Sequence, residues 1–426
     1  MGELFSSMRE VLKGNVLILT LGTVIRQLSL FVTFPFFSLY VRTLGGSMVD
    51  IGIVNAVRPL AAMFIYPIAG ALTDKYSRVK VLVAANLLSV VLYLIYTLAS
   101  DWRYLAVANF VNGLLVFRFP ASSALLADSM DPRLRGRGFA AITVIPGFVG
   151  ILSPFIGGYL MEVFEVELGM RILYGVTVIG MLMITFLNWR YLDETLVTSS
   201  ESTTDIVGII RGSYRDIWET LKWMPRELRF YAVMCVLTMV LNSFVGPYWI
   251  IYSKDIHGVS EFGWGTILTV TNLVQMLLTI PAGTLIDTHD KRKIAAFALA
   301  LSSIPTLAFP YVRGYYSILA VLTVISVANA FLMPLGGAIM ADMVPSERRG
   351  MAMAAIGRGM LVTDLRGGGG GGPSMGFVMT IPVIIGSLLG GYVFQMNPVT
   401  PWIIQGCALF LNAIIATFLL KLPKRD

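Results

Sequence analysis

The sequence has little of what catalysis, metal binding or cross-linking requires. Its 426 residues include only two cysteines and two histidines, and 13% are charged, against about 25% in an average soluble chain. Cys235 and Cys407 both lie in apolar stretches, which supports neither a disulfide framework nor a metal cluster. His257 and His289 fall in expected loops, so the usual components of zinc or Ser-His-Asp chemistry are missing. We therefore expect neither an enzyme nor a cofactor or metal site.

Apolar residues dominate the chain instead. Hydrophobic residues make up 56% of it, in long stretches from end to end, which predicts an all-α, multi-pass protein of the cell membrane. The first stretch, roughly residues 15–40, contains Arg26 and is too long for a cleaved signal peptide, so we expect a retained span. Twelve spans of about 20–26 residues fit, each long enough to cross about 30 Å of hydrocarbon. They are expected to begin near Asn15, Asp50, Val79, Tyr104, Gly138, Gly169, Phe230, Phe262, Lys293, Tyr315, Met375 and Trp402.

The positive charges predict how the chain is oriented in the membrane. Of the 32 lysines and arginines, 24 fall on one side of the expected spans, in both termini, the middle connector and the loops on that side. Because positive charge is retained on the cytoplasmic side, both termini and the connector are expected to be cytoplasmic. The net charge of +7 is thus a topology signal, and no nucleic-acid partner is expected.

A short pattern occurs twice, about half a chain apart. Residues 70–80 read GALTDKYSRVK, and residues 283–293 read GTLIDTHDKRK. An internal duplication in so apolar a chain is a signature of secondary transporters, whose pathway lies between the two halves. We therefore expect two pseudo-symmetric six-helix bundles, residues 1–190 and 229–426, joined by a cytoplasmic linker, residues 191–228. Further pairs keep nearly the same spacing: Pro35 and Tyr40 with Pro247 and Tyr252, and Pro120 and Asp128 with Pro334 and Asp342.

The linker changes character along its length. Residues 198–204 (TSSESTT) are polar, and we expect them to be flexible. After them, apolar residues recur at near-helical spacing with basic residues between, which predicts a short amphipathic helix on the inner membrane surface. An ordinary solvated linker helix is the alternative. The apolar residues are Ile206, Ile210, Ile217 and Leu221, and the basic ones are Arg211, Arg215 and Lys222.

An insertion breaks the symmetry of the halves at residues 350–375. It includes six consecutive glycines, residues 367–372, and has no counterpart in the first half. Six glycines cannot form a stable lipid-exposed helix, so the segment is expected to be a cytoplasmic loop or to be packed in protein. Arg358 and Arg366 flank the glycines, which allows an anion-binding nest of backbone amides; a hinge or tether is the alternative.

The first copy of the repeat resembles the commonest motif of the major facilitator superfamily. The matching residues are Gly70, Leu72, Asp74, Lys75 and Arg78, whereas Ser77 replaces a second glycine. Supporting matches are Asp128 with Arg135-Gly136, Asp342 with Arg349-Gly350, and Gly150, Pro154, Gly157 and Gly158, which resemble the glycine-proline motif of the family's antiporters. The resemblance implies a twelve-helix secondary transporter that works by alternating access between two bundles.

The same resemblance gives the loop motif a gating role. Opposite charges at the inner mouth would latch helices together in one state and release them in the other. The alternative is that these charges only set topology and loop structure. The gating candidates are Asp74, Lys75, Arg78, Asp128, Arg135, Asp287, Asp342 and Arg349.

Three arginines fall near the middle of expected spans. Arg26, Arg58 and Arg118 would each cost about 2.5–3.5 kcal/mol at a helix centre, so we expect them to face an aqueous cavity or a partner. A scaffold requirement would appear in both halves, yet these arginines occur in one. The corresponding residues of the second half are Thr238, Thr271 and Leu332.

Unpaired cations in a wet cavity predict an anionic substrate. None of the 25 acidic residues lies deep in an expected span, and arginine binds carboxylate or phosphate through two parallel hydrogen bonds. We expect a small carboxylate- or phosphate-bearing substrate, driven by exchange for another anion or by its own proton, and a monomeric protein in the lipid bilayer. The alternative is that some of these arginines only bind helix carbonyls or snorkel. Further substrate-binding candidates are Thr33, Tyr40, Asn242 and Gln275.

Two other functions stay open. A multidrug or lipophilic efflux antiporter of the same fold is supported by 24 phenylalanines and 22 methionines. Asn109 argues against it, because drug–proton antiporters of the family often carry an arginine there, as does the lack of a deep acid. A non-transporting membrane sensor is a rival of another class, and the short connector and tail argue against it.

Overall fold

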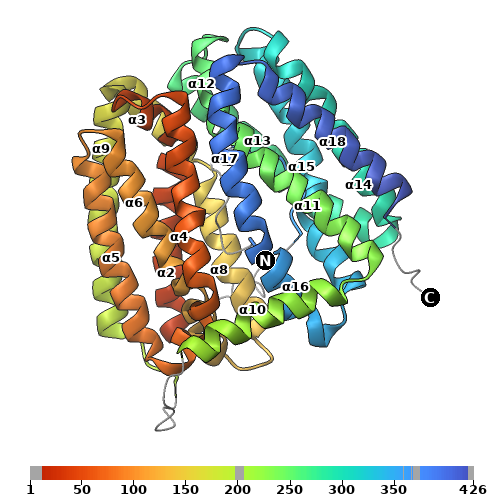
Figure 1. The fold of residues 1–426 in the computed structure, drawn as a ribbon. Helices are drawn as coiled ribbons and strands as arrows, with labels where there is room; N and C mark the ends of the chain where they lie inside the picture. The colour runs from red at the N-terminus through yellow and green to blue at the C-terminus, as the bar shows by residue number, and fades with distance from the viewer. Residues whose placement is uncertain (1–11, 197–205, 358, 366, 368–374, 421–426) are drawn as a thin grey trace, which may run out of the picture.

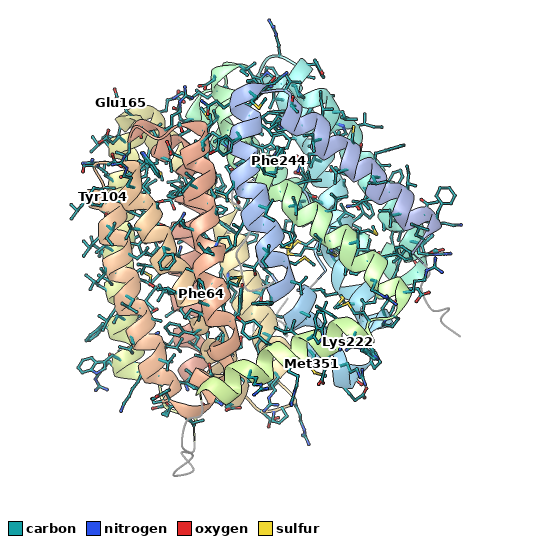
Figure 2. The ribbon with its side chains drawn as sticks, viewed as in Figure 1. Phe64, Tyr104, Glu165, Lys222, Phe244 and Met351 are labelled. Carbon is teal, nitrogen blue, oxygen red and sulfur yellow. The ribbon has the colours of Figure 1, made fainter. Side chains whose placement is uncertain are left out.

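The computed structural model describes residues 12–196, 206–357, 359–365, 367 and 375–420, and this part of the chain is helical and contains no β-strand. Eleven segments of it are long and apolar enough to span a membrane. One of them, residues 135–191, doubles back at Glu165, whose backbone has φ 62° and ψ 162°, so it forms two crossings. Glu165 lies at one end of the bundle (Figure 2). The twelve expected spans are therefore present in the described chain.

Each half of the chain forms its own bundle, the first coloured red to yellow-green and the second green to blue (Figure 1). The first bundle contains α2 (Gly14–Thr33), η1 (Phe34–Phe36), α3 (Phe37–Thr43), α4 (Met48–Lys75), α5 (Arg78–Leu98), α6 (Trp102–Leu114), η2 (Leu115–Phe117), α7 (Arg118–Asp128), α8 (Arg135–Gly150) and α9 (Ser153–Tyr191). The second contains α11 (Arg226–Val245), η3 (Gly246–Tyr248), α12 (Trp249–Asp255), α13 (Glu261–Thr288), α14 (Lys291–Ala308), η4 (Phe309–Tyr311), α15 (Tyr315–Met343), α16 (Ser346–Ile356), α17 (Phe377–Met396) and α18 (Thr400–Phe418).

The outside of the bundles is apolar. Phe64 and Tyr104, labelled in Figure 2, are 58% and 53% exposed. Many other large apolar side chains along the helices are exposed in the same way. A soluble monomer rarely exposes so much contiguous apolar surface, whereas a lipid bilayer covers it.

The repeat seen in the sequence recurs in the geometry of the first and seventh crossings. Proline lacks an N–H and interrupts the helical ladder, and each crossing has a one-turn 3-10 break at Pro35 or Pro247. Beyond the break, the buried Tyr40 hydroxyl donates to the carbonyl of Tyr96 (2.8 Å), and that of Tyr252 donates to the carbonyl of Pro310 (3.2 Å). Residues that the halves share at these positions therefore serve the scaffold.

The helix α10 (Ile206–Trp223) marks one end of the molecule, which we call the linker end (Figure 1). It lies across this end and contacts α4 of the first half and α16 of the second. The ring of Trp223 lies 4.7 Å from the Arg348 guanidinium, and Tyr214 packs edge-on against Phe377. The linker helix predicted from the apolar spacing is therefore present, and it bridges the two bundles.

The two bundles pack directly at the opposite end, which carries α3 and α12 and which we call the far end (Figure 1). There α9 packs on α13, and α4 packs on α17. A Cβ atom on Gly158 would lie 2.5 Å from the carbonyl oxygen of Glu261, and one on Gly265 would clash with that of Pro154. Such close approach of backbones requires glycine. The contact between α4 and α17 repeats this arrangement, because a Cβ atom on Gly391 would clash with the Met48 carbonyl and one on Gly52 with the Ser387 carbonyl.

Burial follows the same asymmetry between the two ends. One hydrophobic core at the far end includes residues of both halves, whereas towards the linker end the described cores each belong to a single half. The structure therefore has the bundles joined at the far end and separate at the linker end, apart from α10. Polar contacts that join the bundles at the far end are Ser260 Oγ and Phe262 N to Glu162 (2.6 and 3.0 Å), Tyr248 Oη to the Met48 carbonyl (3.0 Å), and the Arg42–Asp255 ion pair.

Replacing Gly265 by leucine is expected to disrupt the packing of the bundles at the far end. The new side chain meets the Pro154 backbone, which cannot rotate away, and overpacking typically costs about 1–3 kcal/mol. The thermal unfolding midpoint of the purified protein should fall. Gly147→Leu is the matched control, because nothing lies within 4 Å of a Cβ at that position. Equal unfolding midpoints for the two variants would contradict the close-packed interface.

Candidate functional site

Arg26 and Arg118 line one cavity of about 290 Å³ in the first half, which we call the arginine cavity. Arg26 lies on α2, and Arg118 begins α7 directly after the η2 break in the fourth crossing. Arg118 lies within electrostatic range of Arg26 and, more weakly, of Arg58. The fold thus brings together the arginines that the sequence singles out. The remaining lining residues are Leu19, Gly22, Thr23, Leu82, Asn86, Ser122, Ile184 and Asn188.

These positive charges have no counter-charge in the described part of the protein. Among those residues, no acidic side chain forms an ion pair with Arg26, Arg58 or Arg118. Arg26 donates to the Thr23 hydroxyl at 3.3 Å, and Arg118 donates to the Ser89 hydroxyl at 3.4 Å. Both bonds are long and go to neutral side chains. A buried charge is costly unless it is paired, so an anion entering this cavity would be stabilised.

Two buried asparagines add unused hydrogen-bonding groups to the same cavity. Asn86 is 1% exposed and Asn188 is 4% exposed. Among the described residues, neither polar atom of the Asn86 side chain has a partner, and neither does Oδ1 of Asn188 or Nε of Arg118. Leaving a buried donor or acceptor unpaired typically costs about 1–3 kcal/mol. The cavity therefore offers several groups to a ligand at positions where the protein itself leaves them without partners.

Sequence reasoning missed both asparagines, although the repeat contains a signal for one of them. The second-half residue corresponding to Asn86 is Leu299 or Ala300, and both are apolar. Like the three arginines, Asn86 is a strongly polar side chain inside a span whose counterpart in the other half is of another chemical type. Applied to every polar residue, that comparison identifies Asn86.

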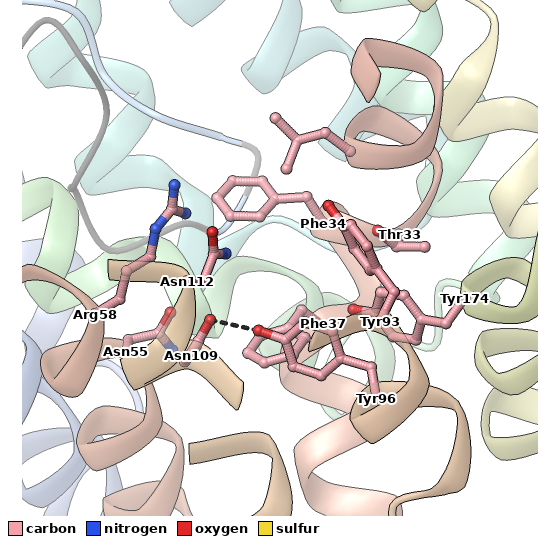
Figure 3. A pocket seen from close by; sticks show the side chains of 11 residues that line it. Thr33, Phe34, Phe37, Asn55, Arg58, Tyr93, Tyr96, Asn109, Asn112 and Tyr174 are labelled. Atoms are coloured by element: carbon pink, nitrogen blue, oxygen red, sulfur yellow. Dashed lines mark hydrogen bonds between the residues drawn. The ribbon is translucent and has the colours of Figure 1, made fainter. Parts of the chain in front are cut away.

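A second cavity of about 500 Å³ lies further towards the far end, and we call it the aromatic cavity. Figure 3 shows Arg58 and Asn112 side by side at its edge. Asn109 is held in its wall: it accepts from the Tyr96 hydroxyl (2.7 Å) and donates to the Val54 carbonyl (2.9 Å). The other lining residues are Leu30, Thr33, Phe34, Phe37, Asn55, Tyr93 and Tyr174.

The second half is filled where the first half carries its arginines. Thr238 is 2% exposed and accepts a hydrogen bond from Asn412 (3.0 Å). Thr271 is 1% exposed, and Leu332 lies fully buried in the second half's own core. The second half thus has buried, uncharged side chains at the three positions that correspond to Arg26, Arg58 and Arg118.

The other substrate-binding candidates do not gather at one place. Thr33 lines the aromatic cavity, whereas Tyr40 is fully buried and bonded to a backbone carbonyl. Asn242 and Gln275 belong to the second half and line neither cavity. Gln275 lies against Met333, with 3.6 Å between Nε2 and the sulfur. The structure therefore brings together the candidates of the first half, with Tyr40 as the exception.

The insertion enters the second bundle instead of lying outside it. Its first residues, up to Ile356, belong to the helix α16, and residues 359–365 follow as irregular chain. A Cβ atom on Gly376 would meet the backbone of Gly357, so the chain enters and leaves at the same place. Residues 359–365 of the insertion are thus packed in protein. Arg358, Arg366 and most of the glycine run lie outside the described residues.

Side chains of the bundle satisfy the backbone of this re-entrant segment. Asn329 donates to the Thr363 carbonyl (2.8 Å) and accepts from its N–H (2.9 Å). Asn242 donates to the Val362 carbonyl (2.7 Å) and accepts from the Asp364 N–H (3.1 Å). Irregular backbone at membrane depth is tolerated only where protein or water pairs it. Asn242 therefore has a structural role that its sequence position did not reveal.

The re-entrant segment also carries an acid to mid-depth. Asp364 lies beside Asn242, near the middle of the seventh crossing, and it is partly buried. Its position between expected spans had placed it in a cytoplasmic loop. The expectation that no acid lies deep in the protein is therefore wrong, because the loop folds back into the bundle.

The described gating candidates form several contacts within their own half. Arg78 pairs with Asp128, and the repeat places Lys291 in the same relation to Asp342. Arg135 donates to the Ala127 carbonyl and Arg349 to the Ala341 carbonyl, both at 3.1 Å. Asp287 is exposed at the end of α13, and the side chains of Asp74 and Lys75 lie outside the described part. These charges brace the linker end of each bundle separately.

Asn329→Ala is expected to release the re-entrant segment. The substitution leaves the N–H and carbonyl of Thr363 unpaired in the core, which typically costs about 1–3 kcal/mol for each group. Thermal stability should fall, and hydrogen exchange at residues 359–365 should accelerate. Asn397→Ala serves as the control, since Asn397 is exposed at the far end. Unchanged exchange in Asn329→Ala would show that these bonds do not hold the segment.

Comparison with known proteins agrees with this architecture. A family model described as Major Facilitator Superfamily matches residues 19–242 and 230–426. Multidrug resistance protein MdtG of Serratia proteamaculans is 25% identical over 333 residues, which cover 76% of this chain and 77% of that protein. A bacterial homologue of the human lysosomal transporter Spinster, solved inward-facing and unoccupied, aligns with TM-score 0.69 and 13% identity over 94% of this chain and 96% of its own. The nucleoside transporter NupG aligns with TM-score 0.68 and 13% identity over 95% and 98%.

Proposed function

This chain belongs to the Major Facilitator Superfamily, and we propose that it is a secondary transporter that carries a small organic or inorganic anion across the cell membrane. Family and fold point to a transporter rather than an enzyme. One observation supports the anionic class: the arginine cavity holds Arg26 and Arg118 without a described counter-charge. An anion that enters it gains charge-assisted hydrogen bonds and relieves the repulsion between the two guanidinium groups.

The joined far end supports a mechanism of alternating access. The bundles meet at the far end and are separate at the linker end, so we propose that the solute enters from the linker end. The positive-inside rule assigns that end to the cytoplasm. Rocking of the bundles about the bound solute would then part the glycine contacts of α9 with α13 and of α4 with α17.

The charge pairs at the linker end fit a bracing role in this cycle. Each pair, Arg78–Asp128 and Lys291–Asp342, ties helices within one bundle. A bundle held rigid in this way moves as one body, which rocking requires. We therefore propose that these pairs preserve the shape of each bundle and that α10 limits the separation between them.

Drug efflux is the second candidate function, and two observations favour it. MdtG is named a multidrug resistance protein, and the aromatic cavity offers rings to an apolar compound. Asp364 at mid-depth also removes one argument against proton coupling, since a deep carboxylate is present. Against drug efflux, the arginine cavity repels the lipophilic cations that such pumps often carry.

Arg26→Gln and Arg118→Gln are expected to weaken binding of the transported anion by about 10- to 100-fold each. Losing one hydrogen bond to a charged group typically costs about 1.5–3 kcal/mol. The measurement is saturable counterflow in proteoliposomes, with a panel of carboxylates and phosphates. Arg103→Gln is the matched control, because Arg103 is 80% exposed at the far end.

Arg26→Lys separates the charge from the geometry. Lysine keeps the positive charge but cannot bind a carboxylate through two parallel hydrogen bonds, so binding should be intermediate. Unchanged counterflow of every anion in the two glutamine variants would refute the anionic class. Transport of lipophilic cations by all variants alike would then favour drug efflux.

A further inference from the structure

The two cavities of the first half follow one another along shared helices, and we infer that they bind one molecule: a flat-ringed organic anion. Its acidic group occupies the arginine cavity, and its ring lies against Phe34 and Tyr93 in the aromatic cavity. This inference rests on the proposed function and narrows it from anions in general to aromatic or similarly planar organic anions.

The cavities follow one another along the same helices. On α2, Arg26 lines the first and Thr33 the second; on α5, Asn86 lines the first and Tyr93 the second. Each pair is seven residues apart, which is roughly 10 Å along a helix. The arginine cavity lies nearer the linker end. A solute that enters from that end therefore meets the arginines first and the aromatic rings about two helical turns further in.

Tyr93 stands at the junction of the two cavities. It lines the aromatic cavity, and it also lies within electrostatic range of both Arg26 and Arg118. A ligand whose acidic group contacts these guanidinium groups can therefore extend along the helices towards the Tyr93 ring. A ring joined to the acidic group by a short chain reaches that position.

Stacked rings support Tyr93 from behind. Its ring is stacked on that of Tyr174 with centroids 6.1 Å apart, and Tyr174 is stacked on Tyr96 at 4.8 Å. Tyr96 and Tyr174 are both buried, whereas Phe34 and Tyr93 are only partly buried. Aromatic side chains prefer offset-stacked or edge-on partners. The buried rings thus support Tyr93, which lines the cavity together with the partly exposed Phe34.

Polar groups lie at the edge of this aromatic platform. Arg58 and Asn112 lie side by side there (Figure 3). Arg58 forms no ion pair with a residue in the described ranges. A ligand pocket with an apolar body and a few polar groups orients its ligand through those groups. Hydroxyl, carbonyl or second acidic substituents of the ring would meet Arg58 and Asn112.

The repeat shows that the fold does not require these residues. Phe34 corresponds to Gly246 and Asn55 to Leu268, whereas the neighbouring Pro35 has its counterpart in Pro247. The second half forms the same crossings with glycine in place of the phenylalanine and leucine in place of the asparagine. The aromatic cavity, like the arginine cavity, is therefore a feature of the first half that the shared scaffold of the two halves does not require.

Matched ligand pairs test the inference on the purified full-length protein. 4-Phenylbutyl phosphate is compared with butyl phosphate, and 4-phenylbutyrate with butyrate, by the concentration that gives half-maximal thermal stabilisation. The four-carbon chain lets the ring reach the aromatic cavity while the acidic group stays in the arginine cavity. The aromatic member of at least one pair should bind at least 10-fold more tightly. Phe34→Leu and Tyr93→Leu should each reduce that ratio towards 1, and Tyr93→Phe should preserve it. Tyr104→Leu, on the outer surface, is the control and should leave the ratio unchanged.

The outcomes separate this inference from the proposed function. If butyl phosphate and 4-phenylbutyl phosphate bind equally and Arg26→Gln weakens both, the aromatic ring is not recognised and the anion transporter stands. If neither member of any pair stabilises the protein, both proposals fall. If Tyr93→Leu and Phe34→Leu weaken both members equally, their rings have only a structural role and the inference is overturned.

Discussion

The cost of placing positive charge inside a membrane protein without a negative partner governs this structure. Arg26 and Arg118 share a cavity in which no described acid pairs with them, and the nearby Asn86 adds further unpaired groups. Each such feature lowers stability. These unpaired groups destabilise the empty protein, and a bound anion would pair them. Their presence together is therefore what an anion-binding cavity requires. Complete internal pairing would leave the cavity with nothing to offer a ligand.

The internal repeat separates the scaffold from the site. Pro35 and Pro247 break the first and seventh crossings in the same way, and Gly158 and Gly391 allow the same close contacts between bundles. These features appear in both halves because both must cross the membrane and meet at the far end. The arginine and aromatic cavities occur in the first half, whereas the re-entrant segment fills the second. The interiors of the two bundles are therefore unlike.

The re-entrant segment fills part of the second bundle and explains the roles of two of its asparagines. Its irregular backbone is paired by the side-chain amides of Asn242 and Asn329. Asn242 was expected to bind substrate, but its amide bonds to the segment and to Gln405. Asp364 reaches mid-depth on the same segment. A carboxylate is thus present at mid-depth, so the lack of a deep acid no longer favours anion exchange.

The sequence by itself determined the membrane class, the twelve crossings, the two bundles and the asymmetric arginines. Those features follow from apolar length and from comparison of the two halves, which are local properties of the chain. Only the tertiary structure decided which groups meet. It joined Arg26 to Arg118 and Asn86, assigned Tyr40 to the scaffold, and folded the segment bearing Asp364 into the second bundle. Such contacts link residues far apart in the chain, and their partners depend on how helices and loops pack, which spacing alone does not encode.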